Sequence, residues 1–576
     1  MLKSIVGSGA LAAGPAFHQS LNPAHSTLGS TLVALIPIVL LLILLPVLRM
    51  SAWQAVTIGA IVTIILAITV WKTPAGSAFG AWGIGAGTGF WSINWITFWG
   101  VVIYNTLVRT GAFEDFKRWL IQQATADVRV QTMLLAWALG ALLEGLVGFG
   151  YPWAVVAPIL VGLGVIELDA IRVAALANNA PVSFGALGAP IIALAAVTKL
   201  PLDTLSASIG RIVAILALLP PWILIVLVTG RRGLRGAWPL AVTASLAFIA
   251  GQLPTSQYLG PYLPDIIGAV AAFGAILLLL RFWRPKEVLG FGGVPVDQDQ
   301  LTRTNGGSSP GARGTPREPA GPRGSLVAVQ PGAAAGTREA VRGLVPFFIL
   351  IAVVVAATGP WSHLGNYNFV KPAVSTVSSL SNKATDVSWA FAPAIAGTWI
   401  LVSWLVIVVV LRATPGQLAD VFRTTFRQMW GALLVAPIIF GLADVFNYSG
   451  MANTMAHGFS RIGPTFLILA PIVGWIGVAL SGSNTSTNAL FGGFQYSVGG
   501  LLHMPPLLLP SLNSVGAEIG KPVAPQTASV GVATSTYVRR EGQVIRYNLP
   551  WTLVLVAYLI LIALFYRGVL PGAMRP

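Results

Sequence analysis

The chain has 576 residues, of which 55% are hydrophobic and only 9% are charged, and its mean hydropathy is +0.78. Soluble proteins carry about 25% charged residues, so this composition excludes an ordinary water-soluble fold. The net charge of +16 comes from Lys and Arg that lie mostly in short loops between apolar runs, which is typical of membrane proteins and argues against nucleic-acid binding.

Apolar stretches begin after a short tail. Residues 1–30 are predicted to be this N-terminal tail, because Gly7, Gly9 and Pro15 interrupt a thin apolar run. A membrane-spanning helix needs about 20 mainly apolar residues. The predicted spans are Thr31–Leu48, Trp53–Trp71, Trp91–Val108, Ile212–Thr229, Trp238–Leu253, Ile266–Phe282, Val345–Ala357, Val387–Leu411, Gln428–Phe446 and Leu549–Tyr566.

Three further apolar regions are interrupted by clusters of Gly, Pro, Asn or Ser. They are Val130–Ile166, Ala170–Leu200 and Thr465–Val538. A break at membrane depth is tolerated only where the freed backbone is buried in protein or lines a cavity. With these regions, the sequence predicts an all-α polytopic membrane protein of about 12–14 membrane segments.

A segment of different composition divides the chain. Residues 285–342 are rich in Gly, Pro, Ser, Ala and Arg, which predicts a disordered linker between a first membrane half (31–284) and a second (343–567), with residues 568–576 as a C-terminal tail. Basic groups near Arg118, Arg232, Arg284 and Arg546 fall on one face if the spans alternate. The positive-inside rule therefore places these loops and the linker in the cytoplasm.

The two halves share short matches at a nearly constant separation. The matched pairs, which lie 332 to 337 residues apart, are Ala141–Gly145 with Val478–Gly482, Asn179 with Asn513, and Gly188–Pro190 with Gly520–Pro522. According to the charge pattern, the span that ends at Arg109 finishes in the cytoplasm, whereas the span that ends at Tyr448 starts there. Two inverted repeats, each with a broken or re-entrant helical hairpin, are a recurrent architecture of secondary transporters.

The first interrupted region contains an acid beside a glycine-rich break. An ionisable residue at membrane depth is costly and usually functional, so Glu144 is a candidate proton carrier. The alternative is a structural glutamate bonded to the backbone at the break. Gly148 and Gly150 are candidate substrate contacts, because a broken helix presents backbone groups to a cavity.

The second half carries a polar run, Ser481–Asn488, at the equivalent position. Since Asn, Ser and Thr are natural N-caps, the half-helix that follows would point its positive dipole end at the cavity, which favours an anionic substrate. Ser483, Asn484, Thr485 and Ser486 are therefore candidate substrate-binding residues. The alternative is close helix packing by small residues.

Four more polar residues lie in or near the interrupted regions. Asn179 and Ser183 are candidates for binding a substrate hydroxyl group. Lys521 could attract a carboxylate or could be a snorkelling loop lysine, and both interpretations stay open. Asp444, inside the predicted span Gln428–Phe446, is a second candidate proton carrier or else a local capping group.

The sequence lacks the signature motifs of several functional classes. No phosphate loop, nucleotide fingerprint or catalytic triad is present, so we expect transport driven by an ion gradient and no enzyme activity. Cysteine is absent and the five histidines never occur at metal-ligand spacing, so neither a metal nor a cofactor is expected. An intramembrane enzyme would need clustered catalytic groups, and a passive channel would need a continuous pore lining.

Motifs in both halves resemble the L-lactate permease family, over about residues 22–567 apart from the linker. They are Trp99–Leu107, Glu144–Pro152, Asn179–Ala186, Gly260–Ile267, Asn447–Gly450, Ser481–Gly492 and Gly520–Gln526. The resemblance implies a plasma-membrane proton symporter for L-lactate, glycolate and related 2-hydroxy monocarboxylates.

The family also resembles a wider ion-transporter class, and in the sodium-coupled dicarboxylate carriers of that class Ser-Asn-Thr tips bind substrate and sodium. Ser483-Asn484-Thr485 spells this triplet, so coupling to sodium, or transport of another small organic anion, stays an alternative to proton symport. Asn484 departs from the family pattern, which usually has aspartate there. The expected partners are thus a small anion, protons or sodium, and membrane lipid. A homodimer is compatible with these features, and the sequence does not set the oligomeric state.

Overall fold

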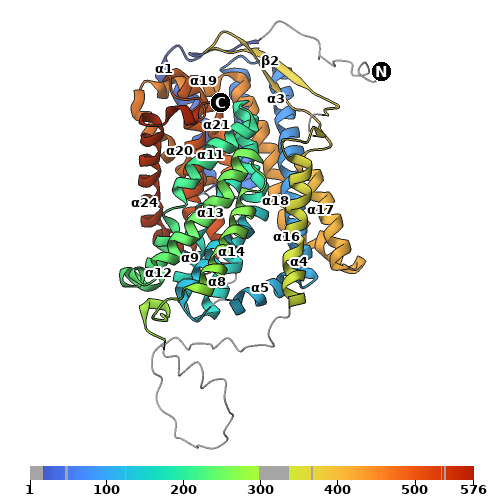
Figure 1. Cartoon of the computed structure of the whole chain (residues 1–576). Coiled ribbons are helices and arrows are strands. Elements are labelled where there is room, and N and C mark those ends of the chain that lie inside the picture. The colour runs from blue at the N-terminus through green and yellow to red at the C-terminus, as the bar shows by residue number, and fades with distance from the viewer. Residues whose placement is uncertain are drawn as a thin grey trace, which may run out of the picture.

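The computed structural model describes residues 17–296 and 337–576, apart from residues 46, 47, 49, 124, 149, 365, 366, 534, 538 and 539. The chain forms a helical bundle with a small sheet at one end (Figure 1). Among the described residues, seven helical stretches are long and apolar enough to cross a membrane, or up to nine if each of two bent pairs is one span. Two further apolar helices, Tyr151–Gly162 and Ala396–Leu411, are shorter and are not counted among these spans. The predicted all-α polytopic class is confirmed.

The first half is helical between short turns. Its α-helices are α1 (Thr27–Leu44), α2 (Ala52–Thr69), α3 (Ala75–Gly87), α4 (Trp95–Arg109), α5 (Ala112–Gln123), α6 (Val128–Gln131), α7 (Gly140–Leu146), α8 (Tyr151–Gly162), α9 (Glu167–Ala177), α10 (Gly185–Thr198), α11 (Leu202–Leu216), α12 (Pro220–Arg235), α13 (Trp238–Tyr258) and α14 (Pro264–Phe282). The π-helices η1 (Thr88–Asn94) and η2 (Thr132–Leu139) and the 3₁₀-helices η3 (Val182–Phe184) and η4 (Phe291–Gly293) complete it.

The second half contains the remaining helices and most of the sheet. Its helices are α16 (Thr337–Thr358), α17 (Ala396–Leu411), α18 (Pro415–Ser449), α19 (Met451–Ser460), η6 (Gly463–Thr465), α20 (Phe466–Ser481), α21 (Asn484–Leu501), α22 (Leu508–Gly520), η7 (Lys521–Val523), α23 (Pro525–Gly531), α24 (Glu541–Gly568) and η8 (Pro571–Met574). In the sheet, β1 (Phe17–His18) pairs in parallel with β2 (Ala373–Val377), which pairs antiparallel with β3 (Ala384–Ser388). The sheet lies at the end of the bundle away from α5 and α12 (Figure 1).

Several predicted spans differ in their bounds from the helices. The stretch Ile212–Thr229 lies inside the candidate span Leu202–Arg235, in which a turn separates α11 from α12, because Pro220 and Pro221 lack the N–H groups that a continued helix needs. Helices α16, α18 and α24 begin earlier than predicted. The stretch Val387–Leu411 begins too early, because Val387 lies in β3 and α17 starts only at Ala396.

Both ends of the predicted linker, and the described part of the predicted C-terminal tail, make contacts with the helical bundle. The start of the linker packs on α6, where Arg129 Nη2 donates to the Glu287 carbonyl at 2.7 Å. Its end belongs to α16, and Arg342 Nη1 donates to Asp115 Oδ2 at 3.1 Å. Residues 297–336 of the linker and 1–16 of the N-terminal tail lie outside the described residues. In the C-terminal tail, the Ala573 carbonyl accepts a hydrogen bond from Arg211.

The two halves repeat the same order of elements around two breaks. A break separates α7 from α8 and another α9 from α10, while the second half has breaks between α20 and α21 and between α22 and α23. The helices that follow the first break of each half, α8 and α21, lie toward opposite ends of the bundle (Figure 1). Two inverted repeats with broken helices are therefore present, as predicted.

Packing brings the breaks of one repeat against those of the other. Helix α10 packs on α21, and α22 packs on η3 and α11. The basic loops also gather at one end, since Arg129 Nη1 donates to the Gly233 carbonyl at 2.9 Å while the same side chain reaches Glu287. The fold thus places the interrupted regions at the centre and the basic loops at the end with α5 and α12 (Figure 1).

Candidate functional site

Glycines make the sharp turns at the two opposed breaks. Gly148, Gly150 and Gly482 have φ angles of 68°, 80° and 70°, a backbone region that only glycine adopts without strain. Close contacts add a second requirement, because a Cβ atom on Gly482 would lie 2.7 Å from the Cβ of Gln526. Phe149, between the first two glycines, lies outside the described residues.

The break in the second repeat is capped by its own serine. The Ser483 side chain accepts a hydrogen bond from the Ser486 backbone N–H at 3.2 Å, which makes Ser483 the N-cap of α21. Asn484, the first residue of α21, donates from Nδ2 to the Ser514 carbonyl at 3.2 Å. The predicted capping is therefore confirmed, and the N-terminus of α21, where the positive end of the helix dipole lies, opens at the break.

A small pocket lies where the two breaks meet. Its volume is ≈ 30 Å³, and its lining includes Glu144, Gly148, Ser483, Asn484, Thr485 and Lys521. Six of the predicted site residues, drawn from both repeats, therefore surround one space. The pocket has room for little more than a water molecule in this conformation.

An ion pair forms one wall of this small pocket. Lys521 Nζ donates to Glu144 Oε1 at 2.5 Å, and both side chains are buried. Asn178 Nδ2 donates to the other oxygen, Oε2, at 2.9 Å. Because Glu144 lies on α7 and Lys521 on η7, the pair joins the two repeats, and Lys521 is a buried partner of an acid rather than a snorkelling loop lysine.

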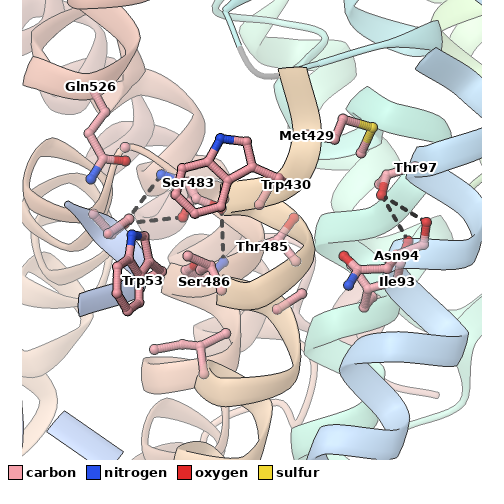
Figure 2. Close-up of a pocket in the computed structure, with 18 of the residues that line it drawn as sticks. Trp53, Ile93, Asn94, Thr97, Met429, Trp430, Ser483, Thr485, Ser486 and Gln526 are labelled. Atoms are coloured by element: carbon pink, nitrogen blue, oxygen red, sulfur yellow. Dashed lines mark hydrogen bonds between the residues drawn. The ribbon is translucent and has the colours of Figure 1, made fainter. Parts of the chain in front are cut away.

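A large cavity adjoins the small pocket and shares Gly482, Ser483 and Thr485 with it. Its volume is ≈ 540 Å³, within the range of small-molecule sites. Figure 2 shows Ser483, Thr485 and Ser486 at one side, Trp53 and Trp430 close to them, and Asn94 and Thr97 across the space. The cavity thus combines polar groups at the tip of α21 with apolar and aromatic walls.

Four predicted site residues line neither space, and one of them, Gly150, lies at the turn before α8. Asn179 is fully buried, and both polar atoms of its side chain lack a partner among the described residues. Ser183 Oγ lies 3.3 Å from Ser514 Oγ, and the Ser183 N–H donates to Glu518 Oε2 at 3.0 Å. Asp444 on α18 has Lys199 as its charged neighbour, so the structure does not bring it to the Glu144–Lys521 pair.

Further polar residues around the breaks were assigned no role from the sequence. Asn488 donates to Ser514 Oγ at 3.0 Å and to the Pro190 carbonyl at 2.9 Å, while Asn513 donates to Asn488 Oδ1 at 2.9 Å. Two buried acids, Asp265 and Glu518, stand close to the ion pair. Their occurrence inside apolar helices was a usable signal, but spacing alone does not show which neighbours they face.

The fold and site together define a multi-pass membrane protein of the carrier type, in which broken helices from two inverted repeats enclose a polar pocket. The L-lactate permease family pattern matches residues 30–570. The chain belongs to the L-lactate permease family and is a membrane transporter.

Named relatives cover nearly the whole chain. The glycolate permease GlcA of Escherichia coli K12 is 33% identical, over 94% of this chain and 96% of its own length. The L-lactate permease of Bacillus subtilis 168 is 30% identical, over 94% and 96%, and that of E. coli K12 is 28% identical, over 93% and 96%. A solved structure, the Alcanivorax borkumensis YdaH transporter, is similar with a TM-score of 0.42 and 14% identity, over 86% of this chain and 88% of that one.

Proposed function

We propose that the protein takes up L-lactate, glycolate and related 2-hydroxy monocarboxylates across the plasma membrane by proton symport. The relatives named as L-lactate and glycolate permeases support the substrate class. The observation that carries the proposal is the buried Lys521 ammonium at the pocket where the tip of α21 opens. A cation and a helix N-terminus at one point suit a small carboxylate.

The candidate residues divide by the part of the substrate they would bind. The carboxylate group would meet Lys521 and the backbone N–H groups near Gly148, Gly150 and Asn484–Ser486, with Ser483 holding the helix tip in place. The hydroxyl group would meet Asn179 or Ser183, which requires the packing around them to open. The rest of the molecule would occupy the large cavity, which is wide enough for a lactate methyl group.

Glu144 is the first candidate for the proton that accompanies the anion. It lies in the same pocket as the proposed substrate carboxylate, whereas Asp444, the second candidate, stands apart on α18. Sodium coupling through the Ser483-Asn484-Thr485 tip is the alternative. Among the described residues, no group of three or more His, Cys, Asp and Glu side chains could hold a metal ion, although a sodium site built from neutral oxygens would not require one.

Uptake into proteoliposomes tests the proposed function directly. We expect purified protein to exchange labelled lactate for internal lactate, and to accumulate it when the inside is made alkaline, in sodium-free buffer. An inward gradient of one pH unit supports about tenfold accumulation for one proton per anion. Absence of both activities would remove lactate and glycolate as substrates, and accumulation that requires sodium would favour the alternative.

A further inference from the structure

Three buried carboxyl groups surround one buried ammonium where the repeats meet. Glu144 on α7, Asp265 on α14 and Glu518 on α22 are each at most 1% exposed, and Lys521 is 4% exposed. Asp265 lies within electrostatic reach of Glu518, Glu144 and Lys521, and Glu518 lies within reach of Glu144 and Lys521. Helices α10, α20 and α21, which pack around this cluster, contain no charged residue.

Only Glu144 has the surroundings of an ionised acid. One of its oxygens accepts from the Lys521 ammonium at 2.5 Å and the other from the Asn178 amide at 2.9 Å. Glu518 accepts a hydrogen bond from the Ser183 N–H through Oε2, and the Ser183 hydroxyl group also interacts with this carboxyl group. Its Oε1 and both carboxyl oxygens of Asp265 have no hydrogen-bond partner in the described parts of the chain.

Burial then sets the charge of each group. A buried carboxylate without a cation or sufficient donors is far more costly than the neutral acid, so Asp265 and Glu518 are protonated in this conformation. Glu144 and Lys521 compensate each other. The four groups together therefore carry no net charge, and an arriving anion would upset this balance unless a positive charge came with it.

The Glu144 side chain also occupies the space that a substrate carboxylate would need. A Cβ atom on Gly185 would lie only 2.5 Å from Glu144 Oε1, so this side chain lies directly against the backbone of the first repeat. The pocket beside Lys521 measures ≈ 30 Å³, which is too small for a carboxylate together with its substituents. An anion can reach Lys521 only when Glu144 leaves it.

We propose that the substrate carboxylate and Glu144 compete for Lys521, so that each bound anion requires one proton on Glu144. The inference rests on the proposed function and names its coupling step. The Glu144–Lys521 ion pair breaks, and the substrate carboxylate pairs with the Lys521 ammonium. The Glu144 carboxylate binds a proton taken up from the aqueous solution on the same side of the membrane as the anion. Asp265 and Glu518 keep their protons, so the occupied site is again neutral and the transport of one anion with one proton moves no net charge.

Lactate affinity as a function of pH tests this competition. Since proton and anion each raise the affinity for the other, the wild-type protein should lose about tenfold in lactate affinity per pH unit over the range in which empty Glu144 is ionised. Glu144→Gln, which cannot ionise, should bind lactate with an affinity that changes less than about twofold over the same range. Equilibrium binding of labelled lactate to the purified protein measures both, and Glu114→Gln, on the exposed α5 pair, should retain the wild-type slope.

Variants of the other two acids show whether the pH dependence comes from Glu144 or from one of them. Glu518→Gln and Asp265→Asn replace acids that stay neutral, so both variants should keep the wild-type pH slope. A potassium diffusion potential should leave lactate accumulation in proteoliposomes unchanged, because the cycle moves no net charge.

Each contrary outcome overturns the inference in a recognisable way. A wild-type pH slope in Glu144→Gln, or no binding at any pH by a monodisperse sample of this variant, would exclude competition at Lys521. A flat profile in Glu518→Gln would make Glu518 the coupling acid instead. If Glu144→Gln cannot be purified, Glu144→Asp takes its place in the test. This variant keeps an ionisable carboxyl group, so it should keep the wild-type dependence of lactate affinity on pH, and loss of that dependence would contradict the inference. If the wild-type protein neither binds nor transports lactate, the proposed function itself fails.

Discussion

Lys521 carries its positive charge at a point where almost no water reaches it. Its stability there depends on Glu144, since the Asp265 and Glu518 carboxyl groups make no contact with its ammonium that would replace this ion pair. The desolvation cost of the two charges roughly offsets their attraction, so the pair adds little net stability. Removal of one partner is costly, because it leaves the other as a buried charge without compensation. The pair is therefore best explained by a role at the site rather than by a role in folding.

Neutralising one or both partners separates these effects. Lys521→Gln should destabilise the purified protein by about 3–5 kcal/mol because Glu144 is left without its cation, and the double variant Glu144→Gln/Lys521→Gln should recover most of that loss. Thermal unfolding measures both. The matched control is Lys117→Gln, whose partner Glu114 at 2.6 Å is exposed on α5, and it should cost at most about 1 kcal/mol. A double variant as unstable as the single one would contradict this account.

The sequence singled out both members of this pair but not their contact. Glu144 and Lys521 each stood out as an ionisable residue in a Gly- and Pro-rich apolar region, which is a local signal. Their hydrogen bond spans 377 positions and forms only because the breaks of the two repeats pack together. Asp265 and Glu518 show the limit, because a single acid in an apolar helix does not reveal which side of the helix is buried against which neighbour.

At the level of elements, the break before α21 depends on one backbone conformation. Gly482 turns the chain at a φ of 70° and brings it against Gln526, and Ser483 then caps the helix. Asn484 and Thr485 at the tip of α21 line the small pocket, and they keep this position only if the turn is kept. The geometry of the glycine thus determines the position of the proposed anion contacts.

Gly482→Ala should abolish lactate transport even if the protein still reaches the membrane. A side chain at this φ is strained by roughly 1–2 kcal/mol, and its Cβ would also collide with Gln526. Uptake and counterflow in proteoliposomes measure the loss. Gly140→Ala in α7 is the control, because a Cβ atom there meets nothing within 4 Å and the variant should transport normally. Normal transport by Gly482→Ala would show that the turn does not position the site.

The elements differ in how well the sequence predicted them. Long uniform spans such as α2 and α14 were found within a few residues of their ends, since twenty apolar residues need a membrane around them. Apolarity does not mark turns, so α11 and α12 were merged across Pro220. The hairpin of β2 and β3 was missed because its two strands have only five residues each and carry no apolar run that would mark them.

For the whole molecule, the open question is which end faces the cytoplasm. The last turn of α12 and the segment after α14 meet at one end through Arg129, and the sheet lies at the other end (Figure 1). The basic end carries the charges that the positive-inside rule assigns to the cytoplasm. The sheet should then face outward, and the large cavity would be one stage of a path between the two sides.

The natural absence of cysteine makes this orientation testable with single substitutions. Lys383→Cys, at the exposed turn between β2 and β3, should react with a membrane-impermeant maleimide in intact cells. Arg232→Cys, exposed near the end of α12, should react only after the membrane is permeabilised, because the positive-inside rule assigns this basic end of the bundle to the cytoplasm. The unsubstituted chain should give no labelling, and both variants should retain lactate uptake. The reverse pattern would invert the assignment and place the sheet inside the cell.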